Sequence, residues 1–294
     1  TLLIGIGAIA GSWLPYVLGN LFDVDRQSAV EGQVPATVVY SFYTGAAVLL
    51  ATILWTIFTT PEYPPSHYAV SDREKKKLPL VPPVMARLLV VQFFSWFALF
   101  SMWVYTTPAV ALKYFGTGDA HSASFQEAGD WVGILFGVYN GISALIALSL
   151  PLVAARTSRK ITHAAALTIG GISLLSFLFI SDPLWLLLPM VGIGIAWGSI
   201  LAMPYAMLAS SIPPDRMGVY MGLFNMSITI PQIVSGVLSG LILEKVFGNN
   251  PLLCLVMAGI SMILGGVATL LIHDRMPEPL TSGKPASPQT DPTQ

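Results

Sequence analysis

The sequence predicts an all-α integral membrane protein, and three observations carry this prediction. Hydrophobic residues make up 54% of the 294-residue chain, and the mean hydropathy is +0.71. Charged residues make up only 10%, against roughly 25% in soluble proteins, which is too few to cover a globule of this size. Eight long apolar stretches follow one another along the chain, and a lipid bilayer is the solvent that such stretches require.

Each apolar stretch predicts one membrane helix. A spanning helix needs about 20 mostly apolar residues, because its backbone amides must find their hydrogen bonds within the segment. No charged residue lies near the centre of any stretch. The predicted helices cover residues 1–22, 37–59, 86–112, 131–154, 162–180, 184–211, 218–243 and 251–272.

The first of these helices, TLLIGIGAIAGSWLPYVLG, starts with the first residue of the chain. A secretory signal peptide would open with a cation and have a shorter apolar part, whereas the first cation here is Arg26. We therefore interpret residues 1–22 as a membrane helix. Because the chain begins with Thr1 rather than Met, we expect it to be a fragment of a longer protein.

The connections between the predicted helices alternate in charge. Of the 14 Lys and Arg residues, only Arg26, Lys113 and Lys245 lie in one set of alternate loops. The others lie in loops 60–87, 155–163 and 212–217 and in the C-terminal tail. Cytoplasmic loops carry the excess of cations, so we expect a multi-pass protein of the plasma (inner) membrane with both ends of the chain in the cytoplasm.

The long, proline-bracketed loop divides the chain. We predict that residues 1–59 form two helices, that residues 60–87 are a cytoplasmic linker, and that residues 88–272 form a six-helix bundle. The tail, residues 273–294, is rich in Pro, Ser and Thr. Such a composition cannot offset the entropy lost on ordering, so we expect a disordered cytoplasmic tail.

Composition also excludes several function classes. The formal net charge is −1, so the chain lacks the basic excess of a nucleic-acid-binding protein. The lone Cys254 cannot form an internal disulfide or a thiolate metal site. The histidines lie in predicted loops or at predicted helix ends without metal-ligand spacing; they are His67, His121, His163 and His273. We therefore expect no nucleic-acid partner, no metal and no cofactor, and a cytosolic enzyme is excluded.

Residues 197–232, WGSILAMPYAMLASSIPPDRMGVYMGLFNMSITIPQ, predict a helix, a Pro-Pro-Asp-Arg turn and a second helix. This stretch resembles the sucrose/proton symporters and their bacterial relatives, in the glycoside–pentoside–hexuronide:cation symporter group of the major facilitator superfamily. The resemblance is carried by Pro204-Tyr205-Ala206, Met217-Gly218, Gly222, Asn225 and Ile230-Pro231-Gln232. Residues 93–105, FFSWFALFSMWVY, are similar to the aromatic seventh helix of that family, but Ser101-Met102-Trp103 stands where plant members carry acidic residues.

The resemblance implies a fold of twelve helices in two halves, of which this chain would supply helices 5 to 12. It implies sugar transport by alternating access, with a small-molecule sugar and the lipid bilayer as partners and a proton as the coupling ion. The basic loop ARTSRKITH resembles a degenerate copy of the superfamily's R-x-G-R-K motif with Ser158 at the glycine position; topology signalling is the alternative interpretation. The implied gate residues are Arg156, Arg159, Lys160, Asp215 and Arg216.

A sugar site needs hydrogen-bonding side chains beside aromatic faces in a cavity near the bilayer midplane. Gln92, Trp96 and Trp103 follow one stripe of their helix, and Asn225, Thr229, Gln232 and Ser239 make a polar stripe on another. Interhelical bonding of the amides and interfacial anchoring of the tryptophans are the alternatives. The candidate substrate-binding residues are Gln92, Trp96, Trp103, Tyr139, Asn140, Trp197, Tyr205, Asn225 and Gln232.

No carboxylate lies inside a predicted span; the nearest, Asp130, is expected at the outer interface where the fourth helix starts. Proton coupling usually requires such a group. We therefore expect the coupling carboxylate in preceding helices, and uncoupled transport is the alternative. The sequence leaves two other functions open, a truncated fragment that does not transport and an integral-membrane enzyme. It leaves the oligomeric state open as well.

Overall fold

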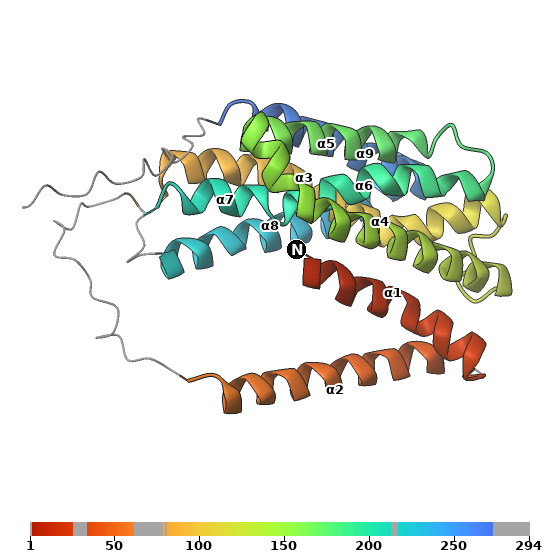
Figure 1. Cartoon of the computed structure of the whole chain (residues 1–294). Helices are drawn as coiled ribbons and strands as arrows, with labels where there is room; N and C mark the ends of the chain where they lie inside the picture. Colours follow the sequence, from red (N-terminus) through yellow and green to blue (C-terminus); the bar gives the residue numbers. More distant parts are fainter. Residues whose placement is uncertain (1, 26–33, 62–78, 80, 213–216, 273–294) are drawn as a thin grey trace, which may run out of the picture.

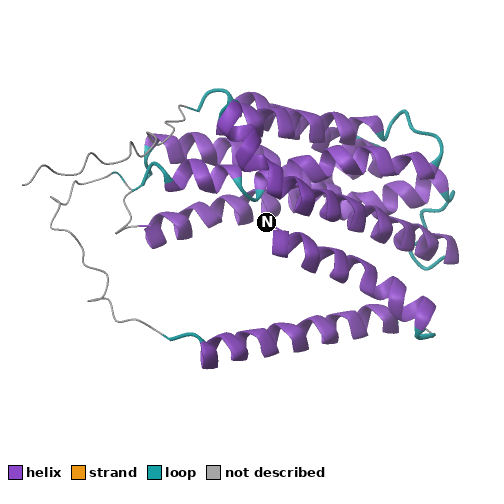
Figure 2. Cartoon of the chain, viewed as in Figure 1, coloured by secondary structure: helices purple, strands orange, loops and turns teal. Residues whose placement is uncertain are grey.

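The computed structural model describes residues 2–25, 34–61, 79, 81–212 and 217–272, and within these ranges it contains helices and no strand (Figure 2). The helices are α1 (Leu2–Leu21), α2 (Ala36–Thr59), α3 (Pro83–Tyr114), α4 (Ala123–Arg156), α5 (Arg159–Ser176), the 3-10 helix η2 (Pro183–Leu186), α6 (Leu187–Ile200), α7 (Met203–Ala209), α8 (Met217–Lys245) and α9 (Pro251–Thr269). Most of the predicted linker, the predicted tail 273–294, and the gate residues Asp215 and Arg216 lie outside the described residues.

The eight predicted helices all correspond to helical segments. Two of them differ from the prediction: one is less apolar than a typical membrane span, and one is broken. Seven segments are long and apolar enough to cross a membrane. The remaining one is α5, in which Arg159, Lys160 and His163 lower the mean hydropathy. The sixth predicted helix is broken into η2, α6 and α7.

The boundary of the fourth helix corrects the prediction for Asp130. Helix α4 begins at Ala123 rather than at residue 131, because the side chain of Ser122 caps it by accepting from the Phe125 amide at 3.2 Å. Its first turns, with Glu127 and Asp130, are polar, which is why hydropathy alone missed them. Asp130 therefore lies inside α4 and not at its start.

Helices α3 to α9 form one bundle, in which α3 packs against α9 and α8, α5 against α9 and α6, and α4 against α6 (Figure 1). Glycines permit the close approaches, as in other membrane bundles. An added Cβ at Gly171 of α5 would stand 2.6 Å from the carbonyl oxygen of Gly259 on α9, and one at Gly194 would stand 2.6 Å from the carbonyl oxygen of Tyr139 on α4.

Helices α1 and α2 lie at the side of this bundle (Figure 1). Helix α1 packs on α4, where Trp13 covers Gly137 and the backbone of Ser12 lies beside Gly133. Helix α2 packs on α1, and Thr37 is its one buried residue. The rest of α2 presents an exposed apolar surface, including Trp55 and Phe58, as expected of a helix whose environment is lipid or further membrane helices.

Candidate functional site

Three tryptophans predicted as substrate-binding residues meet inside the bundle. Trp96 and Trp103 come from α3, and Trp197 comes from α6. Each pair is edge-to-face: the ring centroids are 6.2 Å apart for Trp96 and Trp103, 5.8 Å for Trp96 and Trp197, and 5.7 Å for Trp103 and Trp197. This is the arrangement that the quadrupoles of aromatic rings prefer.

Two residues of α4 fix the orientation of two of these indoles, those of Trp103 and Trp197. Trp103 donates from Nε1 to Tyr139 Oη at 3.0 Å, and Trp197 donates from Nε1 to Asn140 Oδ1 at 3.2 Å. The amide of Asn140 in turn donates to the Phe136 carbonyl at 2.8 Å. The structure thus brings together five of the nine candidates, and we call Trp96, Trp103, Tyr139, Asn140 and Trp197 the tryptophan cluster.

Gly194 explains why α6 reaches α4 at this point. Because it has no side chain, the α6 backbone lies directly against the Tyr139 carbonyl and the Ile142 side chain. That approach places Trp197, one turn later, beside Asn140. Gly192 is packed as closely, since a Cβ there would collide with Ser173 on α5. Gly240, by contrast, has no neighbour within 4 Å among the described residues.

The tryptophan cluster is closed in this structure. Trp96, Tyr139, Asn140 and Trp197 are 6%, 4%, 3% and 8% exposed, and Trp103 is half-buried. Burial of this kind shows that Trp103 packs between helices and is not an isolated anchor on the outer surface of the bundle.

Gln92, one helical turn before Trp96 on α3, is a sixth candidate that lies inside the bundle. It is fully buried, and neither Oε1 nor Nε2 has a hydrogen-bond partner in the described part of the chain. The same holds for Trp96 Nε1. An unpaired buried polar group costs about 1–3 kcal/mol, so these groups can gain free energy from a polar ligand.

The remaining candidates lie apart from the cluster. Tyr205 on α7 donates from Oη to Asn225 Oδ1 on α8 at 3.0 Å, and its ring meets Phe224 edge-to-face at 5.4 Å. Gln232 is partly exposed on α8. Helices α7 and α8 are therefore joined here by one polar bond, which fits the interpretation of the Asn225 amide as an interhelical contact.

The members of the predicted polar stripe on α8 differ in their burial. Asn225 and Thr229 are exposed, but Ser239 is fully buried, with its Oγ 3.2 Å from Ser101 Oγ on α3. Ser235 Oγ lies 2.8 Å from the same Ser101 hydroxyl. Ser239 therefore belongs to a serine contact that holds α3 and α8 together, because its place on the helix turns it toward α3.

The basic loop connects three helices at one end of the bundle. Ser158 caps α5 by accepting from the Ile161 amide at 3.2 Å, which explains a serine at the glycine position of the motif. Arg159 donates from Nη1 to the Ala206 carbonyl of α7 at 2.8 Å. Arg156 ends α4, and Lys160 lies beside Arg159 on α5. The predicted gate residue Arg159 therefore links the start of α5 to α7.

We expect Arg159→Gln to loosen this end of the bundle, because a neutral amide is shorter and forms a weaker bond to the Ala206 carbonyl than a guanidinium does. The unfolding midpoint of the purified protein should fall by a few degrees, which corresponds to about 1 kcal/mol. Lys160→Gln is the matched control and should change the midpoint less. Equal shifts for both variants would contradict a specific role of Arg159.

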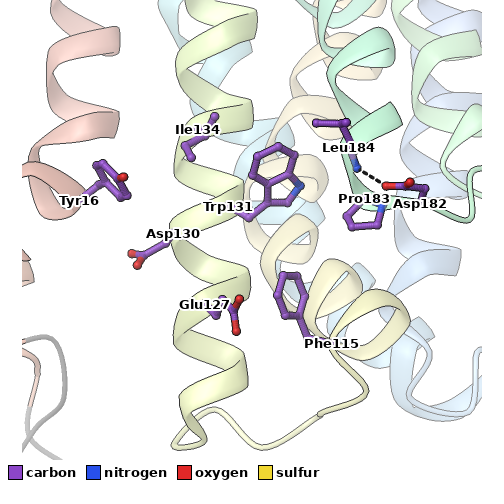
Figure 3. Close-up of a pocket in the computed structure, with 9 residues that line it drawn as sticks. All are labelled: Tyr16, Phe115, Glu127, Asp130, Trp131, Ile134, Asp182, Pro183 and Leu184. Carbon is purple, nitrogen blue, oxygen red and sulfur yellow. Dashed lines mark hydrogen bonds between the residues drawn. The ribbon is translucent and has the colours of Figure 1, made fainter. Parts of the chain in front are cut away.

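A pocket that the sequence did not predict lies between α1 and the first turns of α4 (Figure 3). It has a volume of about 480 Å³ and contains none of the nine candidates. Carboxylates and aromatic rings from α1, α4 and the ends of neighbouring helices share its wall, and the Asp182 carboxylate accepts from the Leu184 amide at 2.9 Å. Its lining residues are Tyr16, Phe115, Glu127, Asp130, Trp131, Ile134, Asp182, Pro183 and Leu184. In the sequence, the one indication of this pocket is the pair of carboxylates Glu127 and Asp130, which lie three residues apart and therefore on one face of a helix.

One histidine is also placed differently from the prediction. His163 lies one turn inside α5, fully buried, with Nδ1 2.8 Å from Ser199 Oγ on α6. The sequence predicts a helix that starts at residue 162, which places His163 at the helix end. Helix α5 starts at Arg159 instead, so His163 lies within the helix and is covered by the bundle. Within the described ranges, no three His, Cys, Asp or Glu residues are grouped so that they could hold a metal ion.

Comparison with protein families gives a match over most of the chain. The family model described as Major Facilitator Superfamily matches residues 1–236 and residues 132–291. No curated protein matches the chain.

Proposed function

Because this chain belongs to the Major Facilitator Superfamily, we propose that it transports a sugar of the disaccharide class, such as sucrose or maltose, by alternating access in symport with a proton. Membrane transport is the activity of the superfamily, and the seven long apolar helices fit a multi-pass membrane protein. We also propose a plasma-membrane location with both ends of the chain in the cytoplasm, on the basis of the loop charges.

The observation that carries the choice of a sugar is the tryptophan cluster together with Gln92. Indole faces suit the C–H surface of a sugar ring, and amides and hydroxyls suit its hydroxyl groups. Both chemistries are present on facing helices, in Trp96 and Trp103 on α3 and in Asn140 on α4. Gln92 has both amide atoms unpaired within the described ranges, so a bound hydroxyl group would supply a partner for them.

The closed state of the cluster implies that α6 must move for a sugar to enter. Helix α6 ends at Ile200 and α7 begins at Met203, so the backbone is already broken four residues after Trp197. Pro204 keeps the break open because it has no N–H to bond the carbonyl of the preceding turn. Broken helices of this kind border the central sites of many transporters.

Uptake of labelled sugar tests the proposal. The complete open reading frame, expressed in cells that lack their own disaccharide uptake, should accumulate labelled sucrose or maltose, and a protonophore should abolish accumulation. Expression of residues 1–294 alone shows whether this part transports unaided. A correctly inserted full-length protein that takes up no glycoside would overturn the assignment, whereas uptake that resists the protonophore would overturn only the proton.

A further inference from the structure

His163 is the one fully buried histidine among the described residues, and the contacts above give it no role. Its ring lies between the start of α5 and the end of α6, with Nδ1 2.8 Å from Ser199 Oγ. The other ring nitrogen, Nε2, is buried and has no hydrogen-bond partner in the described structure. One side of the imidazole is thus fixed and the other is unused.

The surroundings of His163 favour an uncharged ring. Helices α4, α6, α7 and α9 pack against α5. The last three carry no carboxylate, and their titratable groups are Tyr205, which bonds Asn225, and Cys254, at the far start of α9. The carboxylates of α4, Glu127 and Asp130, lie in its first turns, at the end opposite to the one that leads into α5. The charged groups at this end are cations: Arg159 and Lys160 on α5 and Arg156 at the end of α4. A charged imidazole here would be desolvated, unpaired at Nε2 and close to like charges, all of which oppose protonation.

The first turns of α5 also bridge the broken helix. His163 contacts Ser199, which lies just before the break, and Arg159 bonds the Ala206 carbonyl, which lies just after it. The two contacts hold α6 and α7 to the same short stretch of α5. If α6 moves, as the proposed transport cycle requires, the contact between Ser199 on α6 and His163 on α5 must separate, and water then reaches Nε2.

We propose that His163 is the proton-binding residue of this chain, protonated when the α5 start separates from α6 and uncharged when the two are packed. The inference deepens the proposed function and rests on it: the proton would be bound by a histidine in the described bundle rather than by a carboxylate elsewhere. Because the separated state binds one proton more than the packed state, lowering the pH shifts the equilibrium toward separation by up to about tenfold per pH unit. Histidine is the side chain that changes charge between about pH 5 and pH 8.

Cysteine accessibility tests the linkage without any substrate. Ala166 lies on α5 three residues after His163 and is buried. In a Cys254→Ser background, Ala166→Cys would report separation by its rate of maleimide labelling in the purified protein. Ser210→Cys, exposed just after α7, provides the reference that cancels the pH dependence of thiol reactivity.

We expect the labelling rate of the Ala166 reporter, relative to the Ser210 reporter, to rise at least tenfold from about pH 8 to about pH 5. His163→Gln should make this ratio independent of pH, and Ser199→Ala, which keeps the imidazole, should retain the rise. His121→Gln is the matched control, because His121 is exposed outside the bundle. An unchanged pH dependence in His163→Gln would overturn the inference, as would a flat ratio in the parent protein.

The two proposals fail separately. If the full-length protein takes up no sugar but the reporter ratio depends on His163, the sugar assignment is wrong and the proton linkage stands. If uptake is proton-dependent and retains its pH profile in His163→Gln, the transport proposal stands and His163 is not the proton-binding residue.

Discussion

Gly171→Val should prevent the six-helix bundle from forming a stable unit. A Cβ at this position would stand 2.6 Å from the Gly259 carbonyl oxygen and 3.1 Å from the Ile263 amide nitrogen of α9. Both are backbone atoms in a regular helix, so they cannot move aside as a side chain would. The helices α5 and α9 would have to separate along their contact, and overpacking of this kind typically costs about 1–3 kcal/mol or more.

The measurement is the amount of monodisperse protein recovered in detergent and its unfolding midpoint. Gly45→Val on α2 is the matched control, because no described atom other than those of its chain neighbours and its own helix backbone lies within 4 Å of a Cβ there. It introduces the same side chain into a membrane helix at no packing cost. A Gly171→Val protein that is as stable as the Gly45→Val protein would show that α5 and α9 do not pack as described.

The sequence was sufficient to predict the helices, because long apolar segments separated by charged loops leave few alternatives in a membrane. Their ends were less predictable. Helix α4 starts with polar residues such as Glu127 and Asp130, and only the cap at Ser122 shows where it begins. The break between α6 and α7 was equally hidden, since hydropathy continues across it.

The site was predicted in part. The spacing of Trp96 and Trp103 places them along one face of α3, and the structure brings both to Trp197. Nothing in the spacing indicates that Asn140 lies under Trp197, because that pairing depends on how closely α6 approaches α4 at Gly194. Burial of His163 depends in the same way on a contact between separate helices.

Asn140→Leu should nearly abolish transport and should weaken the packing of α4 on α6. Leucine is close to asparagine in size, so the change removes the acceptor of Trp197 Nε1 and leaves a buried donor unpaired. That costs about 1–3 kcal/mol. In a site where the indole also contacts the substrate, the freed ring would turn away from its bound position. Uptake of labelled disaccharide should then fall by about tenfold or more at equal surface expression.

A double-mutant cycle separates this effect from general damage. Trp197→Phe removes the indole N–H, so Asn140→Leu should cost much less stability in that background than in the parent protein. Trp185→Phe, at an exposed tryptophan of η2, is the matched control and should leave the cost of Asn140→Leu unchanged. Additive costs for Asn140→Leu and Trp197→Phe would mean that the bond between them contributes nothing. In that case the orientation of Trp197 would have to come from its contacts with Trp96 and Trp103 alone.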